Sequence, residues 1–514
     1  MSRIKNKNIY SNRISLVPLA KEVWFALFLL AIVFVMHPGK ASAATINVAT
    51  GSAHTNSGDS ICQLEEAVEN INDGARTYTD CVESGSYGTN DTINLPAGTI
   101  NNDGSGIYLN IHSEVNPYSS VSIIGQGKGV SILDGINFTG SGFNGNYDDI
   151  LTLSDFTMRA DQDNPLYTNI MFQGSSLTIE RVEIDGNNID STGVRAENTD
   201  NVVIRDSYIH NFTDLDGSGM DSGILIVSMN YSSDVIIEGN TISQAPRGIA
   251  TESYDGSSLG NVVLDMDVRN NTFVNINDDQ PWDVHIHQLN SAMMIAAAFG
   301  GAHLNYTTTN NTFVNAESGT YTTAIFEYIN NDNEINHTSQ NDLYAVGNDS
   351  GSANYRSIDE DGSGVFSTTS LGGNVSSDNT YSGLLDDSSD QHGLSSLASF
   401  LGVLSDNGGE VPTIELLDGS PAIDAGTSVL GMSTDARGVS RPQGIAFDSG
   451  AYEKIASNGS GGDGNNGGSG NNGSNDGNGS NGANDSNRPV SNKGGSLGET
   501  GLSSSLFLQH LVST

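Results

Sequence analysis

The stretch "SDVIIEGNTISQAPRGIATES", Ser233 to Ser253, decides the fold of this chain. Apolar and polar residues alternate up to a corner at Gly239-Asn240, and a second short apolar run follows at once. Side chains of a strand point alternately to its two faces, so this spacing predicts two short strands joined at a corner, with no room for a helix. One such unit is too small to bury its own inward face.

The unit is repeated along the chain. With Asn240 as the reference, similar units are centred 25 to 40 residues apart, on Val182, Ser207, Asn271 and Asn311. Three columns, which lie five and three residues before the centre and two after it, are almost wholly apolar: Leu177, Val202, Val235, Met266 and Tyr306; Ile179, Ile204, Ile237, Val268 and Thr308; Ile184, Ile209, Ile242, Phe273 and Phe313. Repeats of this period predict a solenoid of stacked parallel strands.

Glycine or asparagine stands at each later corner. Gly239, Asn270 and Asn310 precede the centre of their units, where the chain must turn and where these residue types tolerate a left-handed backbone. The asparagine that follows in each unit would lie above its counterpart in the next. We expect these side chains to hydrogen-bond from rung to rung.

The outward column two residues before the centre alternates in charge. In order it holds Glu180, Arg205, Glu238, Arg269 and Thr309. If the rungs stack in sequence order, opposite charges become lateral neighbours, which is favourable by about 0.2 to 1 kcal/mol for each pair. We therefore expect both arginines to be structural, since flanking carboxylates hold the proton on a guanidinium.

The first 43 residues have the features of a secretory signal peptide. Basic residues precede the apolar run "WFALFLLAIVFVM", Trp24 to Met36, and the small-residue site Ala41-Ser42-Ala43 follows it. The run is shorter than the roughly 20 apolar residues that a spanning helix needs. We expect export, with no stable membrane span in the mature chain.

Two cysteines, Cys62 and Cys81, lie in and just after the one convincing helical pattern. In an exported chain, a lone pair of cysteines favours a disulfide over a metal site. Closing a loop of this size would stabilise the fold by roughly 3 kcal/mol in the chain-entropy model. The helix is predicted over residues 60–73, where four apolar residues fall at helical spacing: Leu64, Ala67, Val68 and Ile71.

The composition is strongly acidic. There are 61 Asp and Glu against 20 Lys and Arg, for a formal charge of −41. A field of this sign argues against nucleic acid and anionic membrane surfaces as partners, and it favours solubility and association with divalent cations. The sequence also has no phosphate-binding loop on a strand-helix unit and no nucleophile elbow.

Three stretches resemble a known family. "ICQLEEAVENIND", residues 61–73, and the segment that continues to residue 100 resemble the N-terminal cap called the CSLREA domain. "VSIIGQGKGVSILDG", residues 121–135, resembles the early rungs of pectate-lyase-like right-handed parallel β-helices. "LSDNGGEVPTIELLDGSPAIDAG", residues 404–426, and the later "DARGVSRPQG" resemble the choice-of-anchor Q segment of bacterial surface proteins.

This resemblance implies an all-β fold, a right-handed parallel β-helix with a short N-terminal helical cap, and a location that is secreted or on the bacterial cell surface. It divides the chain into a signal peptide (1–43), a cap (44–91), the parallel β-helix (92–375), a closing segment (376–455), a disordered Gly/Asn/Ser linker (456–493) and a degenerate anchor-like tail (494–514). We expect the closing segment to cover the open end of the solenoid, since an uncovered last rung invites aggregation.

The least rung-like segment, residues 278–303, holds the main candidates for glycan contact. His285 and His287 would share one face of a strand, and Trp282 offers an apolar platform for a sugar. Arg247 is a further candidate. A long insertion with solvent-facing histidines is the alternative, because an H-x-H pair falls short of the three or four ligands that zinc takes.

Two Asp-rich turns are candidates for Ca²⁺. Asp214, Asp216 and Asp221 gather oxygen ligands in one turn, and Asp359 and Asp361 do so in another. Neither turn continues to the glutamate of an EF-hand loop, and ordinary Asp-Gly turns are the alternative account. No cofactor is required by this interpretation, and Ca²⁺ is the one candidate ion.

Every regularity in the sequence serves the scaffold, which favours a non-catalytic function. We expect an adhesin-like monomer that contacts a polysaccharide or a cell-surface glycan. The alternative is a polysaccharide lyase or glycoside hydrolase that acts on an outward face, with Arg247 or the segment 282–303 involved. A Ca²⁺-stabilised matrix protein is a third. A groove with convergent Asp, Arg and His would favour the enzyme, and a flat ladder of Thr, Asn and Glu the binding protein.

Overall fold

The structure is a computed structural model, and it describes residues 43–455 with gaps. The gaps are residues 89, 103–106, 112–119, 141–148, 161–167, 214–220, 230, 255–261, 277–289, 298–300, 316–321 and 347–351. The predicted linker and tail lie outside the described residues, as does the predicted signal peptide apart from Ala43.

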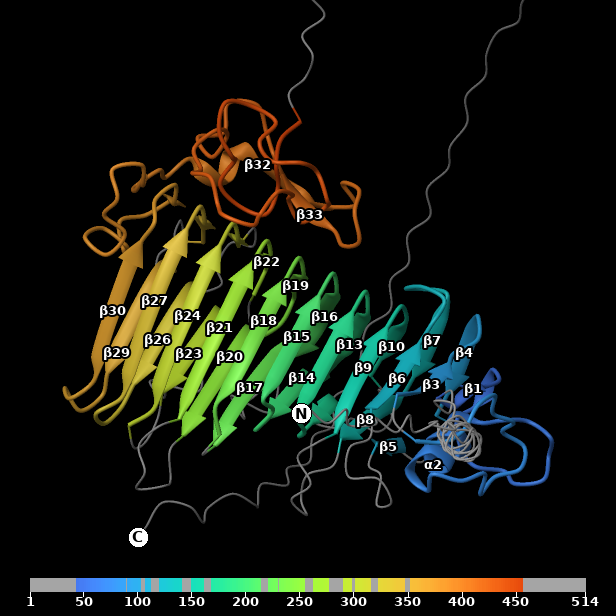
Figure 1. The fold of residues 1–514 in the computed structure, drawn as a ribbon. Coiled ribbons are helices and arrows are strands. Elements are labelled where there is room, and N and C mark those ends of the chain that lie inside the picture. Colours follow the sequence, from blue (N-terminus) through green and yellow to red (C-terminus); the bar gives the residue numbers. More distant parts are fainter. Residues whose placement is uncertain are drawn as a thin grey trace, which may run out of the picture. The chain divides into compact units, whose positions relative to one another are not determined.

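Three parallel sheets wind around a common core (Figure 1). Within each sheet, neighbouring strands are separated in sequence by strands of the other sheets, so the chain passes around the coil once per rung. This is the predicted right-handed parallel β-helix.

The first sheet has eleven described strands, which in order are β1 (Thr45–Asn47), β3 (Asp91–Asn94), β6 (Ser120–Ile124), β9 (Ile150–Ser154), β12 (Ser176–Glu180), β15 (Asn201–Arg205), β18 (Ser233–Glu238), β21 (Val263–Arg269), β24 (His303–Thr309), β27 (Glu334–Gln340) and β30 (Val365–Ser370). Its first strand lies in the range predicted as a separate cap, so the ladder extends ahead of residue 92.

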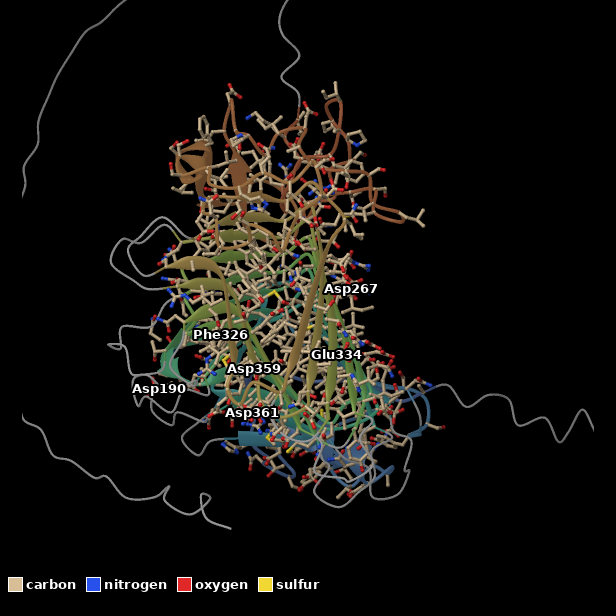
Figure 2. The ribbon with its side chains drawn as sticks, turned by 90° about the vertical axis from the view of Figure 1, so that its left-hand side faces the viewer. Asp190, Asp267, Phe326, Glu334, Asp359 and Asp361 are labelled. Carbon is tan, nitrogen blue, oxygen red and sulfur yellow. A yellow bond between two sulfur atoms is a disulfide. The ribbon has the colours of Figure 1, made fainter. Side chains whose placement is uncertain are left out.

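The second sheet also has eleven described strands, namely β2 (Gly51–Ser52), β4 (Gly98–Asn101), β7 (Ser131–Asp134), β10 (Thr157–Arg159), β13 (Glu183–Asp190), β16 (Tyr208–Thr213), β19 (Thr241–Ser243), β22 (Thr272–Val274), β25 (Thr312–Val314), β28 (Leu343–Ala345) and β31 (Val375–Ser376). The third has nine, namely β5 (Ile107–Ile111), β8 (Ile136–Gly140), β11 (Thr168–Phe172), β14 (Thr192–Glu197), β17 (Ile224–Met229), β20 (Arg247–Tyr254), β23 (Ser291–Ala297), β26 (Thr323–Ile329) and β29 (Ala353–Asp359). Figure 2 places Asp267 and Glu334 on the side of the first sheet and Phe326 on the side of the third.

The predicted register is confirmed. Val235 pairs with Val202 on one side and with Met266 on the other, and Ile242 lies between Ile209 and Phe273. The inward side chains of these columns form one continuous buried cluster along the coil. Stacking therefore provides the core that no single rung can form.

The N-terminal helix α2 (Leu64–Asn72) is shorter at both ends than predicted. It starts after Gln63, which forms a capping box with Glu66, and its four predicted apolar residues are all buried. The disulfide between Cys62 and Cys81 is confirmed. None of the helices among the described residues has the length and hydropathy needed to cross a membrane.

An asparagine ladder fixes the corner between the first two sheets, as predicted. Asn240 Nδ2 donates to Asn271 Oδ1 at 3.0 Å, and Asn271 Nδ2 donates to Asn311 Oδ1 at 3.1 Å. The ladder continues beyond the predicted units through Asp342 and Asn374. The preceding residues at 239, 270 and 310 have φ angles of 66°, 54° and 54°, so each takes the predicted left-handed backbone.

The closing segment covers the last rung with its first residues. Tyr381 and Leu385 are buried in the main core. The Tyr381 ring lies 4.8 Å, between centroids, from the rings of Tyr344 and Tyr355.

The rest of the segment, with η2 (Leu397–Phe400), β32 (Leu401–Ser405) and β33 (Thr413–Leu416), packs along the side of the coil (Figure 1). An apolar cluster joins it to the outer face of the second sheet, with Val274, Val314, Leu343 and Val375 from the sheet and Leu397, Ile414, Leu416 and Tyr452 from the segment. Asn310 Nδ2 donates to Asp448 O at 3.1 Å across the corner. The sequence did not predict this lateral wall.

Replacement of a ladder asparagine should destabilise the coil. Asn271→Ala removes the group that pairs with Asn240, Asn311 and the buried Ile237 carbonyl. The unpaired polar groups should lower the free energy of unfolding by about 3 kcal/mol, measured by urea denaturation. Asn47→Ala, which breaks an Asn–Asn bond on the exposed face, is the control and should change it little. Equal losses in the two variants would contradict the role of the ladder.

The charge of Asp342 should make the same ladder pH-dependent. Burial raises the pKa of Asp342 to about 6 from an ordinary 3.8, so its neutral form favours folding and that contribution is lost as pH rises through 6. Asp342→Asn should therefore raise the free energy of unfolding at pH 7 by on the order of 2 kcal/mol. The gain should fade toward pH 4 in urea titrations. An equal gain in the free energy of unfolding at pH 4 and pH 7 would refute the role of the Asp342 charge. The control is Asp418→Asn, because the side chain of Asp418 is 94% exposed.

Candidate functional site

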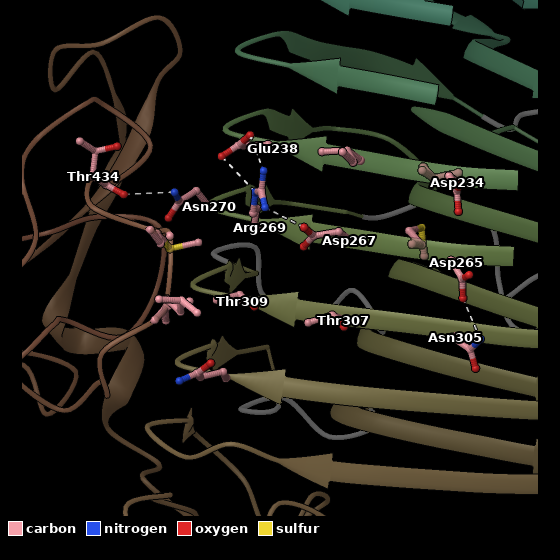
Figure 3. Close-up of a pocket in the computed structure, with 18 of the residues that line it drawn as sticks. Asp234, Glu238, Asp265, Asp267, Arg269, Asn270, Asn305, Thr307, Thr309 and Thr434 are labelled. Carbon is pink, nitrogen blue, oxygen red and sulfur yellow. Dashed lines mark hydrogen bonds and ion pairs between the residues drawn. The ribbon is translucent and has the colours of Figure 1, made fainter. Parts of the chain in front are cut away.

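A groove lies between the outer face of the first sheet and loop 429–434 of the closing segment (Figure 3). Its volume is about 800 Å³. Strands β18, β21, β24 and β27 form the floor, and Leu430, Met432 and Thr434 belong to the opposite wall. The floor repeats with the rungs, because side chains at equivalent positions of parallel strands lie beside one another.

A smaller hollow of about 360 Å³ continues this groove toward the N-terminal rungs. It adds Glu180, Arg205 and Asp206 to the lining. Glu238 and Asn270 line both hollows, so the two adjoin, and we call them together the lateral groove.

Three rows of outward side chains form the floor. In the first row, Asp234 lies beside Asp265, and Asn305 follows on the next rung. Asn305 Nδ2 donates to Asp265 Oδ1 at 2.7 Å. The second row runs Ile236, Asp267, Thr307, and the third runs Glu180, Arg205, Glu238, Arg269, Thr309. The third row confirms the predicted column of alternating charge.

Both arginines of the lateral groove are held by carboxylates, as predicted. Arg205 Nη2 lies 3.3 Å from Glu180 Oε2, and Arg269 Nε lies 3.1 Å from Glu238 Oε1. Arg269 Nη1 also donates to Asp267 Oδ2 at 2.8 Å. Burial alone lowers the pKa of Arg269, but the hydrogen bond to Glu238 and the charges of Asp267 and Glu238 outweigh it and raise that pKa. Arg269 therefore stays protonated and is no base.

Asp267 is a carboxylate of the main floor whose pKa is raised. Burial raises its pKa, the charge of Glu238 adds to this effect, and Arg269 opposes it. In Figure 3 its side chain lies beside Arg269 at the middle of the floor. A partly desolvated carboxylate of this kind gains from a positive charge or a hydrogen-bond donor in the groove.

Asn270 lies where the two parts of the lateral groove meet. Its left-handed corner brings the amide against the closing segment, where Nδ2 donates to Thr434 O at 3.3 Å (Figure 3). The residue is 4% exposed, and its Oδ1 accepts no hydrogen bond from any residue that the structure describes. A hydrogen bond from a donor would therefore stabilise this buried acceptor.

The wall of the lateral groove is built on a buried ion pair. Arg441 Nη1 lies 3.0 Å from Glu453 Oε2, and both side chains are fully buried. Arg441 also donates to the carbonyls of Asp448 and Gly450. Asp435, which lines the smaller hollow, is bound by Arg437 at 2.7 Å. These residues carry the sequence resemblance of the segment, and their contacts are internal to its fold.

Among the residues that the structure describes, none of the predicted glycan contacts lines the lateral groove. Trp282, His285 and His287 lie outside those residues. His303, at the end of the same segment, begins β24, and its Nδ1 lies 3.0 Å from Glu334 Oε2. Arg247 is 2% exposed and its Nη1 contacts Met294 Sδ at 3.8 Å on the third sheet, away from the first sheet that forms the groove.

The predicted Ca²⁺ residues are not gathered into a site within the part of the chain that the structure describes. Asp214 and Asp216 lie outside it, and Asp221 is 5% exposed. Asp361 accepts hydrogen bonds from Ser363, as an ordinary Asp-Gly turn would provide. Among the described residues, no group of three or more His, Cys, Asp or Glu is arranged to hold a metal ion.

The fold and the lateral groove define the class: a parallel β-helix protein with a polar channel along one face. No family model and no curated protein matches the chain. Among solved structures, the chain is similar to the crystal structure of pectate lyase Pel9A, with 14% identity, a TM-score of 0.39, and coverage of 81% of this chain and 98% of the other. A likeness at this level carries no inference about activity, and the class rests on the strand pairing.

Sequence reasoning missed the acidic floor. The columns four and six residues before each centre, which hold Asp234, Asp265 and Asp267, continue the same outward face as the alternating-charge column. The alignment of the repeats therefore contained their positions. It contained no signal for the wall, because loop 429–434 is remote in sequence from the floor.

Loss of the buried cation should open the wall of the lateral groove. Arg441→Met leaves Glu453 charged, buried and unpaired, which should destabilise the closing segment by about 3 to 5 kcal/mol. Hydrogen exchange of peptides covering residues 430–453 should accelerate, while that of the coil should not. Asp418→Asn, which breaks the exposed pair with Lys454, is the control in the same segment. Unchanged exchange in Arg441→Met would show that the pair does not hold the wall.

Proposed function

We propose that the protein is an exported, non-catalytic β-helix protein that binds a glycan in the lateral groove. The observation that carries the proposal is an open channel of about 800 Å³ whose floor repeats from rung to rung. Carboxylate, amide and hydroxyl groups along it suit sugar hydroxyls, and Ile236, Leu430 and Met432 supply apolar contact. A repeating floor suits a repeating polymer.

Binding is favoured over elimination because neither arginine of the lateral groove is free to act as a base. A lyase needs a group that can take a proton beside the substrate. Arg205 and Arg269 are each paired with carboxylates, and no histidine is among the described residues that line the groove. The acidic floor would also repel a polyuronate unless cations intervened.

One observation favours a second candidate, a glycoside hydrolase. Such an enzyme uses two carboxyl groups, one of which must hold a proton near neutral pH. Asp267 has a raised pKa and lies in the groove beside other carboxylates. This candidate would assign Asp267 the role of the acid, and substitution of that residue separates it from the binding function.

Export and surface location are part of the proposal. They are supported by the signal-like leader and by the disulfide between Cys62 and Cys81, a bond typical of exported proteins. We extend the proposal to a CSLREA-like cap and a choice-of-anchor Q-like closing segment. The internal contacts of Asp435, Arg437 and Arg441 give the second of these motifs a structural role.

The mature chain should bind at least one polysaccharide from a panel of neutral, uronate and amino polymers. It should cleave none of them, so neither reducing ends nor unsaturated ends should be released. Thr307→Arg, which places a bulky cation on the floor, should weaken retention by roughly tenfold or more. Thr369→Arg is the matched control, since Thr369 lies in the same row two rungs along and outside the groove lining.

Two results would contradict this function. Product release that Asp267→Asn abolishes would identify a hydrolase. Failure of the folded chain to retain any polymer of the panel would remove the binding function.

A further inference from the structure

The lateral groove has a strong excess of negative charge. Seven carboxylates and two guanidinium groups line its two parts, and no lysine is among the described lining residues. Of the seven, Asp435 is neutralised within the wall by Arg437. The other six face the channel, where Arg205 and Arg269 are the described cations of the lining, and Lys128 lies close to Asp206 outside that lining. The chain as a whole is acidic, but here the charge is enclosed between two walls, which concentrates its field.

The two arginines do not remove this excess. Arg205 is paired with Glu180 on the third row, and Arg269 is bound to Glu238 on the third row and to Asp267 on the second. Asp234 and Asp265 on the first row have no described arginine or lysine within ion-pair distance, and Asp265 accepts only a neutral amide from Asn305 among the hydrogen bonds described. These two carboxylates are exposed to the channel, so their charges are available to pair with a ligand.

The spacing of the carboxylates follows the rungs. Asp234 and Asp265 occupy paired positions on adjacent parallel strands, which lie about 4.8 Å apart. This repeat is close to the length of one pyranose ring in an extended glycan. A chain laid across the strands would therefore meet one carboxylate from each of these two rungs, with Asp267 on the neighbouring row.

Asn270 supplies an independent indication of what the ligand presents. Its Oδ1 is a hydrogen-bond acceptor, is buried, and is unpaired among the described residues, while its Nδ2 is already used by Thr434. The amide of Asn270 lines both parts of the lateral groove. A ligand in that groove would therefore satisfy Oδ1 with a hydrogen-bond donor. Ammonium and hydroxyl groups are such donors, and a carboxylate is not.

We propose that the ligand of the lateral groove is a positively charged amino glycan, a polymer of hexosamine units with free amino groups. This inference rests on the proposed glycan-binding function and names its ligand class. The ammonium groups of the glycan pair with Asp234, Asp265 and Asp267, and another donor of the same glycan hydrogen-bonds to Asn270 Oδ1. Charge-assisted hydrogen bonds of this kind are stronger than neutral ones, so the free amine and the N-acetylated unit are distinguished by charge.

The test compares two oligosaccharides of equal length. The mature chain is titrated calorimetrically with a hexamer of glucosamine and with its N-acetylated counterpart, at a pH where the amines are protonated. The free amine should bind about tenfold tighter or better, and its affinity should fall as salt is raised. An oligogalacturonate, with and without Ca²⁺, forms the third arm and should not bind in either condition.

Two variants and one control locate the site. Asp265→Asn with Asp267→Asn should weaken binding of the free amine by about tenfold or more and leave the N-acetylated hexamer within about twofold. Asn270→Gly keeps the left-handed corner, as Gly239 does in the neighbouring rung, and should weaken binding by removing the acceptor. Glu334→Gln, on the same sheet outside the groove lining, should leave both affinities unchanged.

The outcomes separate this inference from the function on which it rests. Equal binding of the two hexamers, or binding of the free amine that the double variant does not weaken, would overturn the amino-glycan assignment and leave glycan binding in place. Binding of the galacturonate only with Ca²⁺ would overturn it as well, in favour of a cation-bridged polyuronate. Failure of every glycan to bind the folded chain would remove both.

Discussion

The structure depends on one constraint, which is that each rung must bury its inward face against the next. Side chains of a strand alternate with a period of two, so a slip of one residue would bring Glu238 into the core and expose Ile237. The stacked columns and the asparagine ladder act together against such a slip, because both require the same register. Once that register is set, the outward rows are set with it.

The outward rows show how one register serves both stability and chemistry. It places Arg205 and Arg269 beside Glu180 and Glu238, so the arginines stabilise the first sheet and hold their protons. The same register aligns Asp234 with Asp265, where like charges lie side by side without a described counter-ion. Like charges opposite one another are unfavourable in a sheet. Their presence on an otherwise well-paired face is one of the observations on which the proposed ligand site rests.

Sequence reasoning succeeded where interactions repeat with the rungs. The apolar columns, the left-handed corners and the alternating Glu and Arg column were all predicted, because each is a local pattern copied at a regular interval. The ladder was predicted only as far as Asn311, although Asp342 and Asn374 continue it in the structure. Asp342 stands where the two preceding units have asparagine, so the run of asparagine centres is interrupted after Asn311.

The candidate site was less accessible to the same reasoning. Unusual residues drew attention to Trp282, His285, His287 and Arg247, and the first three lie outside the described residues. The lateral groove instead uses ordinary Asp, Asn and Thr residues, whose meaning depends on what lies opposite them. No composition rule distinguishes an outward Asp in a channel from an outward Asp in bulk solvent.

The sequence by itself determined the class of fold, the register of the rungs and the pairing of the two cysteines, because these follow from local periodicity and from a count of two thiols. Only the tertiary structure decided that the closing segment returns along the coil and that loop 429–434 faces β18, β21 and β24. That contact joins residues far apart in the chain through an apolar cluster and a few backbone acceptors, and neither leaves a periodic trace. The lateral groove therefore forms only when the closing segment folds back along the coil. The outward rows of the first sheet then face a wall instead of bulk solvent.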